Sequence, residues 1–170
     1  MKSIAVILST FAILTAATGN RRVTQNKQSP PAETSTKIGG QAVTIEYNAP
    51  SARGRKVEGG LVPYGEIWRL GADSATTLTT DTNLKIGNLE VPKGVYTLYI
   101  AASESGWQLV VNKQKGQWGT EYNQPQDLGR VPMKVTKLSQ PVETLKISLT
   151  DGMLEIEWGN TKASVPVKQG

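Results

Sequence analysis

Short apolar segments with an alternating pattern, separated by glycine-containing turns, are the feature that most restricts the fold of this chain. Residues 42–47 (AVTIEY) place their larger apolar side chains on one face, which is typical of a half-buried strand. Residues 84–91 (LKIGNLEV) carry Gly87-Asn88 between two apolar runs, a two-residue hairpin signal. Further strand-like segments are 95–102, which is apolar on both faces, 107–112, 133–139, 143–149, 153–158 and 161–167. Gly159-Asn160 is expected to be a turn, and Pro166 suggests that the last strand lies at an edge. The sequence therefore predicts an all-β protein of eight or nine short strands, an antiparallel β-sandwich of jelly-roll-like or immunoglobulin-like type.

Two residue types that carry much of enzyme chemistry are absent, because the 170-residue sequence contains no cysteine and no histidine. Without cysteine there are no disulfides, no thiolate metal sites, no cysteine nucleophile and no lipidated cysteine anchor. Without histidine the commonest general base and metal ligand is missing. No known catalytic motif is present and the acidic residues are scattered. The sequence thus predicts no catalytic residue, no metal site and no cofactor, and favours a protein that is not an enzyme.

The N-terminus has the features of a secretory signal peptide. Lys2 supplies a positive charge, residues 4–14 are apolar, and small residues follow, so cleavage after Ala17 is expected. The apolar run is too short for a stable membrane anchor, which needs about 20 residues. We therefore expect residues 1–17 to be a signal peptide, no transmembrane anchor after its cleavage, and a periplasmic or extracellular protein.

A polar segment follows the expected signal peptide. Residues 18–37 contain a Pro30-Pro31 pair and no apolar period, which predicts a disordered linker. The folded part is then expected to be one β-sandwich domain, residues 38–170.

Most of the excess positive charge precedes that domain. The chain has 19 basic and 14 acidic residues and a net charge of +5. The charged residues before residue 38 are Lys2, Arg21, Arg22, Lys27, Lys37 and Glu33. The expected domain keeps 14 basic and 13 acidic residues, a net charge of +1. Nucleic-acid binding requires basic residues clustered on the folded part, so the sequence predicts no nucleic-acid partner.

Two long irregular segments, 51–77 and 117–130, are the candidate binding loops, because long loops on a β scaffold often carry function. Both contain glycine, proline, aromatic residues and arginine. Aromatic side chains can form apolar walls, and arginine can orient an anion. The alternative is structural: Arg69 could pair with Asp73, and Arg130 with Asp127. The candidate ligand-binding residues are Arg55, Tyr64, Trp68, Arg69, Asp73, Trp118, Tyr122, Asp127 and Arg130.

The same two segments resemble a known family. The motifs Gly-Arg-Lys, Leu-Val-Pro-Tyr-Gly, Trp-Arg-x-Gly-Ala and Gln-Trp-Gly are similar to those of the bacterial domain-of-unknown-function family 2911 (DUF2911), over roughly residues 41–168. The resemblance implies an exported protein and no established activity. It places Arg55, Tyr64, Trp68, Arg69, Gly71, Trp118, Gly119, Asp127 and Arg130 at signature positions. One departure is that Asp73-Ser74 stands where the family usually has Asn-Glu, which argues against catalysis by that glutamate.

Three functions remain open from the sequence. The first is a binding module for a small polar or anionic ligand in the cell envelope, held by the two loops. The second is a hydrolase that uses Asp73 with Asp127 or Glu121 as acid and base. The third is a structural or envelope-assembly module without a small ligand, whose partner would be an envelope protein.

Overall fold

The computed structural model of the chain describes residues 29–170, in which nearly all the regular secondary structure is β-strand. The expected signal peptide and residues 18–28 of the expected linker lie outside the described residues. The strands are β1 (Pro31–Ile38), β2 (Gln41–Asn48), β3 (Ile67–Trp68), β4 (Thr77–Thr80), β5 (Leu84–Ile86), β6 (Leu89–Val91), β7 (Gly94–Ser103), β8 (Gly106–Asn112), β9 (Asp127–Thr150) and β10 (Met153–Gln169). A single 3₁₀ turn, η1 (Gln124–Gln126), is the one helical element of this part of the chain.

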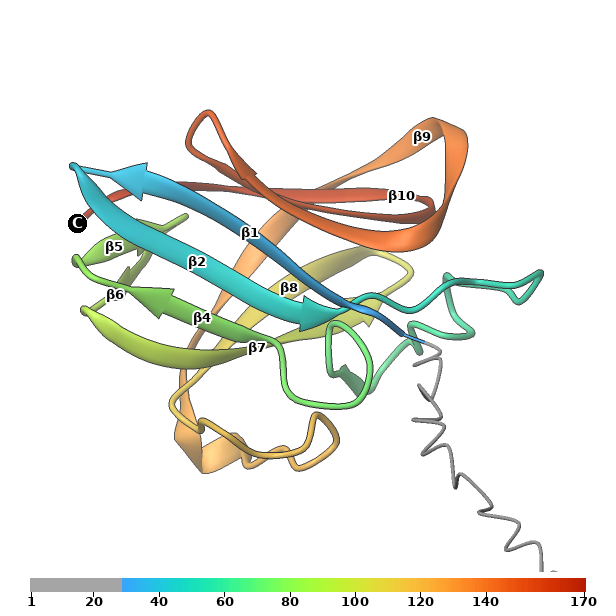
Figure 1. Cartoon of the computed structure of the whole chain (residues 1–170). Coiled ribbons are helices and arrows are strands. Elements are labelled where there is room, and N and C mark those ends of the chain that lie inside the picture. Colours follow the sequence, from blue (N-terminus) through green and yellow to red (C-terminus); the bar gives the residue numbers. More distant parts are fainter. Residues whose placement is uncertain (1–28) are drawn as a thin grey trace, which may run out of the picture.

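Nine of the ten strands form one continuous hydrogen-bonded path, and every ladder is antiparallel. The order is β1-β2-β4-β7-β8-β9-β10-β5-β6, with β3 paired to β7. This confirms the all-β, antiparallel prediction, with ten strands instead of eight or nine. The path curls so that β9 and β10 lie across the molecule from β4 and β7, and the core fills the space between them (Figure 1).

Strand β1 corrects the predicted linker. All eight of its residues pair with β2, from Pro31 opposite Asn48 to Ile38 opposite Gln41. The hairpin turns at Gly39 and Gly40, which have φ of 58° and 79°, a region that glycine adopts without strain. A polar sequence forms a strand here because β2 supplies the backbone partners, and composition alone does not show this. The folded part therefore begins before residue 38.

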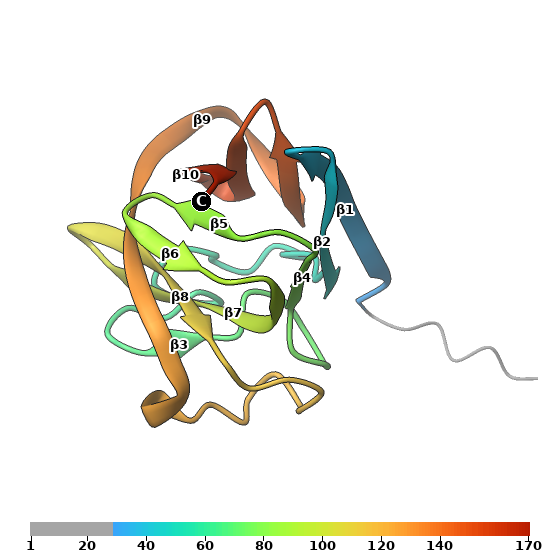
Figure 2. The ribbon, with the colours of Figure 1, turned by 90° about the vertical axis from the view of Figure 1, so that its left-hand side faces the viewer.

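The two long C-terminal strands each merge two segments that the sequence presents as separate strands. Segments 133–139 and 143–149 belong to one strand, β9, and segments 153–158 and 161–167 belong to β10. Gly159-Asn160, which we expected to be a turn, is an irregularity in the β9–β10 ladder, with Gly159 at φ 58°. Glu58 Oε1 stabilises this bulge by accepting hydrogen bonds from Asn160 N (2.9 Å) and Thr161 Oγ1 (2.8 Å). Figure 2 shows β9 running from one end of the molecule to the other.

The end of β2 closes against β9 through both backbone and side chains. Leu145 N donates to Pro50 O and Ala52 N donates to Glu143 O, each at 2.8 or 2.9 Å. Farther along β9, side chains replace a strand: Ile147 N donates to Tyr47 Oη at 3.0 Å and Leu149 N to Thr34 Oγ1 at 3.1 Å. The free edge of β9 is thereby covered, which protects it from pairing with other chains.

The core contains side chains from both sides of the curled sheet. Trp68 of β3 stacks on Trp158 of β10, with ring centroids 5.6 Å apart, and Trp158 Nε1 donates to Glu143 O. Both rings are buried. The central strand β7 is buried on both faces between Tyr96 and Ile100, as its sequence predicts. Within residues 29–170, no helix is long and apolar enough to cross a membrane.

Candidate functional site

The two candidate loops dock on each other through their backbones. Gly119 N donates to Asp73 O at 2.9 Å, Ala75 N donates to Gln117 O at 3.2 Å, and Ser74 and Trp118 form a β-bridge. Gly119 must be glycine because a Cβ there would lie 2.9 Å from both Asp73 O and Arg69 Cδ. The two segments that carry the family-like motifs are thus parts of one compact unit.

Backbone strain concentrates beside Arg69. Asp73 has φ 57°, a left-handed conformation that aspartate and asparagine tolerate best among non-glycine residues. Leu70 has φ 50°, which is unfavourable for a branched apolar residue. The fold holds Leu70 there because its side chain is fully buried and its carbonyl accepts a 2.7 Å hydrogen bond from Thr76 Oγ1. Strain of this kind is found preferentially at functional sites.

The second loop covers the outer face of β7 and β8, opposite the main core (Figure 1). Gln117 Nε2 donates to Thr97 Oγ1 (3.0 Å) and Tyr99 Oη (3.1 Å), and Asn112 Nδ2 donates to Asn123 O (3.0 Å). The Tyr122 ring packs edge-on against Tyr99, with centroids 5.0 Å apart. Polar and aromatic contacts therefore fix the loop to the sheet.

Tyr122, Asp127 and Arg130 form one hydrogen-bonded network. Tyr122 Oη donates to Asp127 Oδ2 at 2.6 Å, and Arg130 Nη2 donates to Tyr122 Oη at 2.9 Å and to Asp127 Oδ2 at 3.2 Å. Burial, together with the hydrogen bond to Asp127, raises the pKa of Tyr122, which is therefore neutral at physiological pH. The Arg130 charge is neutralised by Asp127, so the structural alternative is the arrangement observed for this pair.

Arg69 is arranged differently. Its Nε donates to Gly71 O at 3.2 Å, and no carboxylate of the described residues forms an ion pair with it. The side chain is half-buried. It lines a cleft of about 500 Å³ between the two loops, which we name the Arg69 cleft. Tyr99 and Tyr122 contribute aromatic side chains to its wall, whereas Trp68, which also borders the cleft, turns its ring into the core against Trp158.

A second cleft, of about 740 Å³, adjoins the first, since Glu66 and Ile67 line both. We name it the Gln108 cleft. Its lining includes Ala101, Gln108, Gln124, Arg130 and Pro132. Three of the predicted residues, Trp68, Arg69 and Tyr122, thus lie in the Arg69 cleft, and Arg130 lies in its neighbour.

The other predicted residues lie outside these two clefts. The Arg55 guanidinium donates to Ala52 O and Ser51 O, both at 2.9 Å, and shapes its own loop. Tyr64 is partly exposed and its ring lies against Gly59. Trp118 is 49% exposed and is not part of the lining of either cleft. Asp73 acts through its backbone, and Asp127 holds Tyr122 and Arg130 in place.

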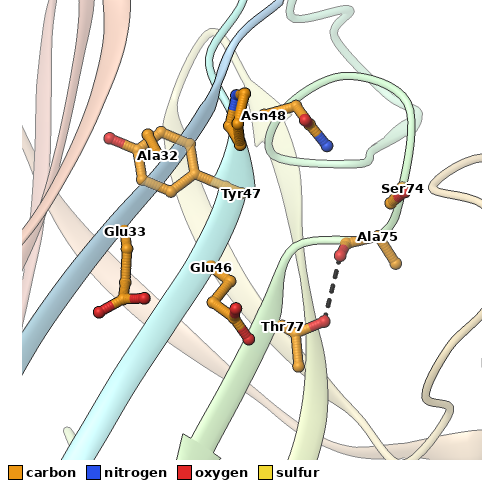
Figure 3. Close-up of a pocket in the computed structure, with 9 residues that line it drawn as sticks. Ala32, Glu33, Glu46, Tyr47, Asn48, Ser74, Ala75 and Thr77 are labelled. Carbon is orange, nitrogen blue, oxygen red and sulfur yellow. Dashed lines mark hydrogen bonds between the residues drawn. The ribbon is translucent and has the colours of Figure 1, made fainter.

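A further cleft, of about 380 Å³, lies on the outer face of β1 and β2 (Figure 3). Glu33 and Glu46 are direct partners across the two strands, and their side chains lie next to each other in the view. Both are exposed to water, and no cation lines this cleft. Two neighbouring carboxylates repel an anion, so an anionic ligand does not fit here.

The carboxylates that the hydrolase hypothesis requires do not line the described clefts. These carboxylates are Asp73, Glu121 and Asp127. None of them lines the three clefts described above, or a further cleft of about 330 Å³ beside Arg55. Among residues 29–170, no three or more aspartates and glutamates come together to hold a metal ion.

Sequence reasoning missed several residues of the clefts, chiefly Glu66, Ile67, Tyr99 and Gln108. Tyr99 lies in a strand that reads as apolar on both faces, and only its hydroxyl distinguished it from a core residue. Gln108 looked like the polar face of an ordinary strand. These residues line the clefts because the second loop covers the outer face of β7 and β8. The alternation of apolar and polar residues along a strand does not show which face a loop will cover.

Comparison with known proteins agrees with the motifs. No curated protein and no solved structure matches the chain. The family model described as "Protein of unknown function (DUF2911)" matches residues 29–167, which includes β1 and almost all of β10. The chain therefore belongs to the DUF2911 family.

Proposed function

We propose that this protein is a binding module for a small anionic or polar ligand, which is held in the Arg69 cleft. The observation that carries the proposal is a half-buried guanidinium with no carboxylate partner, in a cleft with aromatic walls. Burying part of a charge without a counterion is unfavourable, and an anionic ligand would relieve this cost. Concave sites with apolar walls and a few polar groups are where small ligands bind.

Each residue of the cleft has a distinct part in this proposal. Arg69 binds the anionic group, because its guanidinium presents paired N–H donors that suit carboxylate, phosphate and sulfate. Tyr99 and Tyr122 provide apolar ring surface beside it. The strained backbone at Leu70 and the contact with Gly119 hold Arg69 at the junction of the loops.

The proposed location is outside the cytoplasm, in the periplasm or the extracellular space. Support comes from the signal peptide expected at residues 1–17. N-terminal sequencing of the mature protein tests this, and an N-terminus at Thr18 is the expected result.

Thermal unfolding of the protein against a panel of organic acids, phosphates, sulfates and sugars tests the binding function. A ligand at 100 times its dissociation constant stabilises a protein by about 2.7 kcal/mol, which raises Tm by roughly 5–10 °C for a chain of this size. Arg69→Gln should abolish the shift while keeping the aliphatic stem that packs on Gly119. Lys37→Gln, an exposed cation on β1, is the matched control.

The outcomes separate the alternatives. A shift that Arg69→Gln leaves unchanged would place the ligand elsewhere and contradict the proposal. A panel without any shift would favour the structural or envelope-assembly module. In that case the contacts within and between the loops would explain their aromatic and charged residues without a ligand. No observation in the clefts favours the hydrolase.

A further inference from the structure

The Arg69 cleft and the Gln108 cleft lie next to each other over the outer face of the sheet, and we name the two together the trough. Both are lined by Glu66 and Ile67, so they adjoin at β3. Together they are much larger than a single small anion requires. The shape of the trough therefore restricts the class of ligand further than the proposed function does.

The floor of the trough is a straight row across four strands. In the ladder register, Ile67 pairs with Ala101, Ala101 with Gln108, and Gln108 with Pro132. Adjacent strands are about 4.8 Å apart, so three strand spacings give a row of roughly 14 Å. Paired residues point to the same face, and here that face is the outer one, because the next row, Ile100 with Leu109, points into the core.

Neutral polar side chains lie in the floor of the trough and beside it. Gln108 and Gln124 are exposed amides, and each amide both donates and accepts hydrogen bonds. The floor residues Ile67, Ala101 and Pro132 are apolar. Apolar patches beside paired donors and acceptors match sugar units, whose C–H faces are apolar and whose hydroxyl groups donate and accept.

Among the residues that line the two clefts, the cation without a counterion lies at one end. Arg69 is unpaired, whereas the charge of Arg130 in the Gln108 cleft is neutralised by Asp127. Glu66, exposed between the two clefts, disfavours further anionic groups in the middle of the trough. An anionic group therefore fits at the Arg69 end, and uncharged groups fit along the remainder.

From these observations we propose that the trough binds an oligosaccharide with one terminal acidic sugar, whose acid group contacts Arg69 and whose neutral units lie along the Ile67–Pro132 row. This inference rests on the proposed function, since it specifies the ligand of the same site. It makes Gln108 a specificity-determining residue for the neutral units.

Titration calorimetry on the full chain tests the proposal with sialyllactose and with an aldotetraouronic acid, an acidic sugar attached to neutral xylose units. The separate probes are N-acetylneuraminate, glucuronate and lactose. We expect at least one acidic oligosaccharide to bind tenfold or more tightly than its own acidic monosaccharide, and lactose to bind weakest. Gln108→Ala should remove most of that gain and leave the monosaccharide affinity unchanged. Arg69→Gln should weaken both by tenfold or more, and Gln140→Ala, an exposed residue that lines neither cleft, should change nothing.

The results that overturn this inference differ from those that overturn the proposed function. Binding of simple acids that depends on Arg69, without any gain from attached neutral sugars, would refute the elongated sugar site and leave the anion site intact. An extended acidic peptide that binds through Arg69 more tightly than either oligosaccharide would also refute the sugar site and leave the anion site intact. If no anion binds in an Arg69-dependent manner, both proposals are wrong.

Discussion

The hydroxyl of Tyr47 provides a sharp test of how the sheet closes. Tyr47 Oη accepts a hydrogen bond from Ile147 N at 3.0 Å, and both residues are buried, at 8% and 3% exposure. Tyr47→Phe keeps the ring in the core but leaves this backbone N–H without an acceptor and without access to water. An unsatisfied buried donor costs about 1–3 kcal/mol. For a chain of this size, that corresponds to a fall in Tm of roughly 2–12 °C.

Two control variants make the test specific. Tyr96→Phe also removes a buried tyrosine hydroxyl, which donates to Pro92 O at 2.8 Å, but Pro92 is exposed and water can replace the donor. Thr34→Val removes the acceptor of Leu149 N at a half-buried position, so its cost should be intermediate. The free energy of unfolding in urea should therefore decrease in the order wild type, Tyr96→Phe, Thr34→Val, Tyr47→Phe. If Tyr47→Phe were as stable as Tyr96→Phe, side-chain closure of β9 would not be a stabilising feature of this fold.

Three further predictions concern the loops. Gly119→Ala should lower the free energy of unfolding by about 1–3 kcal/mol, because the added Cβ meets the Asp73 carbonyl. The control Gly106→Ala has open space around its Cβ and should cost no more than about 0.5 kcal/mol. Urea titrations of both variants measure these differences. Asp127→Asn should lower the free energy of unfolding by roughly 1–2 kcal/mol, because it removes the ion pair with Arg130. It should also accelerate hydrogen exchange in residues 113–126. Unchanged exchange would contradict the role of the Tyr122–Asp127–Arg130 network in fixing this loop. Burial raises the pKa of both Tyr99 and Tyr122 in the folded state. The unfolded chain therefore loses these protons first, so stability should be constant up to about pH 9 and fall as the pH rises through about 10, as denaturation at a series of pH values would show.

The sequence contained enough information for the strands that alternate or that flank a strong turn. β2, the β5–β6 hairpin, β7 and β8 all lie where the pattern predicts them, because in each case burial of one or both faces dictates the residue types. β1 could not be predicted in the same way. Its backbone partner in β2 holds it in place, and its half-buried face contributes only Ala32 and Ile38 as apolar contacts with the core.

The irregularities of β9 and β10 were also hidden from sequence reasoning. A glycine at positive φ is needed at a turn and at a β-bulge alike, so Gly159 gave no means of distinguishing the two. Pro166 suggested an edge strand, but β10 has β9 on one side and β5 on the other. The proline is tolerated because the β9 ladder ends at Ser164 and the β5 ladder begins at Val167.

For the candidate site, the sequence treated Arg69 with Asp73 and Arg130 with Asp127 as equivalent pairs, and the structure separates them. Of these two pairs, only Arg130 with Asp127 is an ion pair. Asp73 instead has a left-handed backbone conformation, and its carbonyl accepts a hydrogen bond from Gly119 N of the other loop. This difference predicts opposite effects on stability. Arg130→Gln should lower the free energy of unfolding, because it leaves Asp127, at 14% side-chain exposure, without its counterion. Arg69→Gln removes a half-buried charge that has no counterion, so the free energy of unfolding should stay constant or rise by up to about 1 kcal/mol. A loop built only for folding would lose stability at both positions. A gain or no change at Arg69, together with loss of ligand binding, is the behaviour of a residue retained for function at the expense of stability.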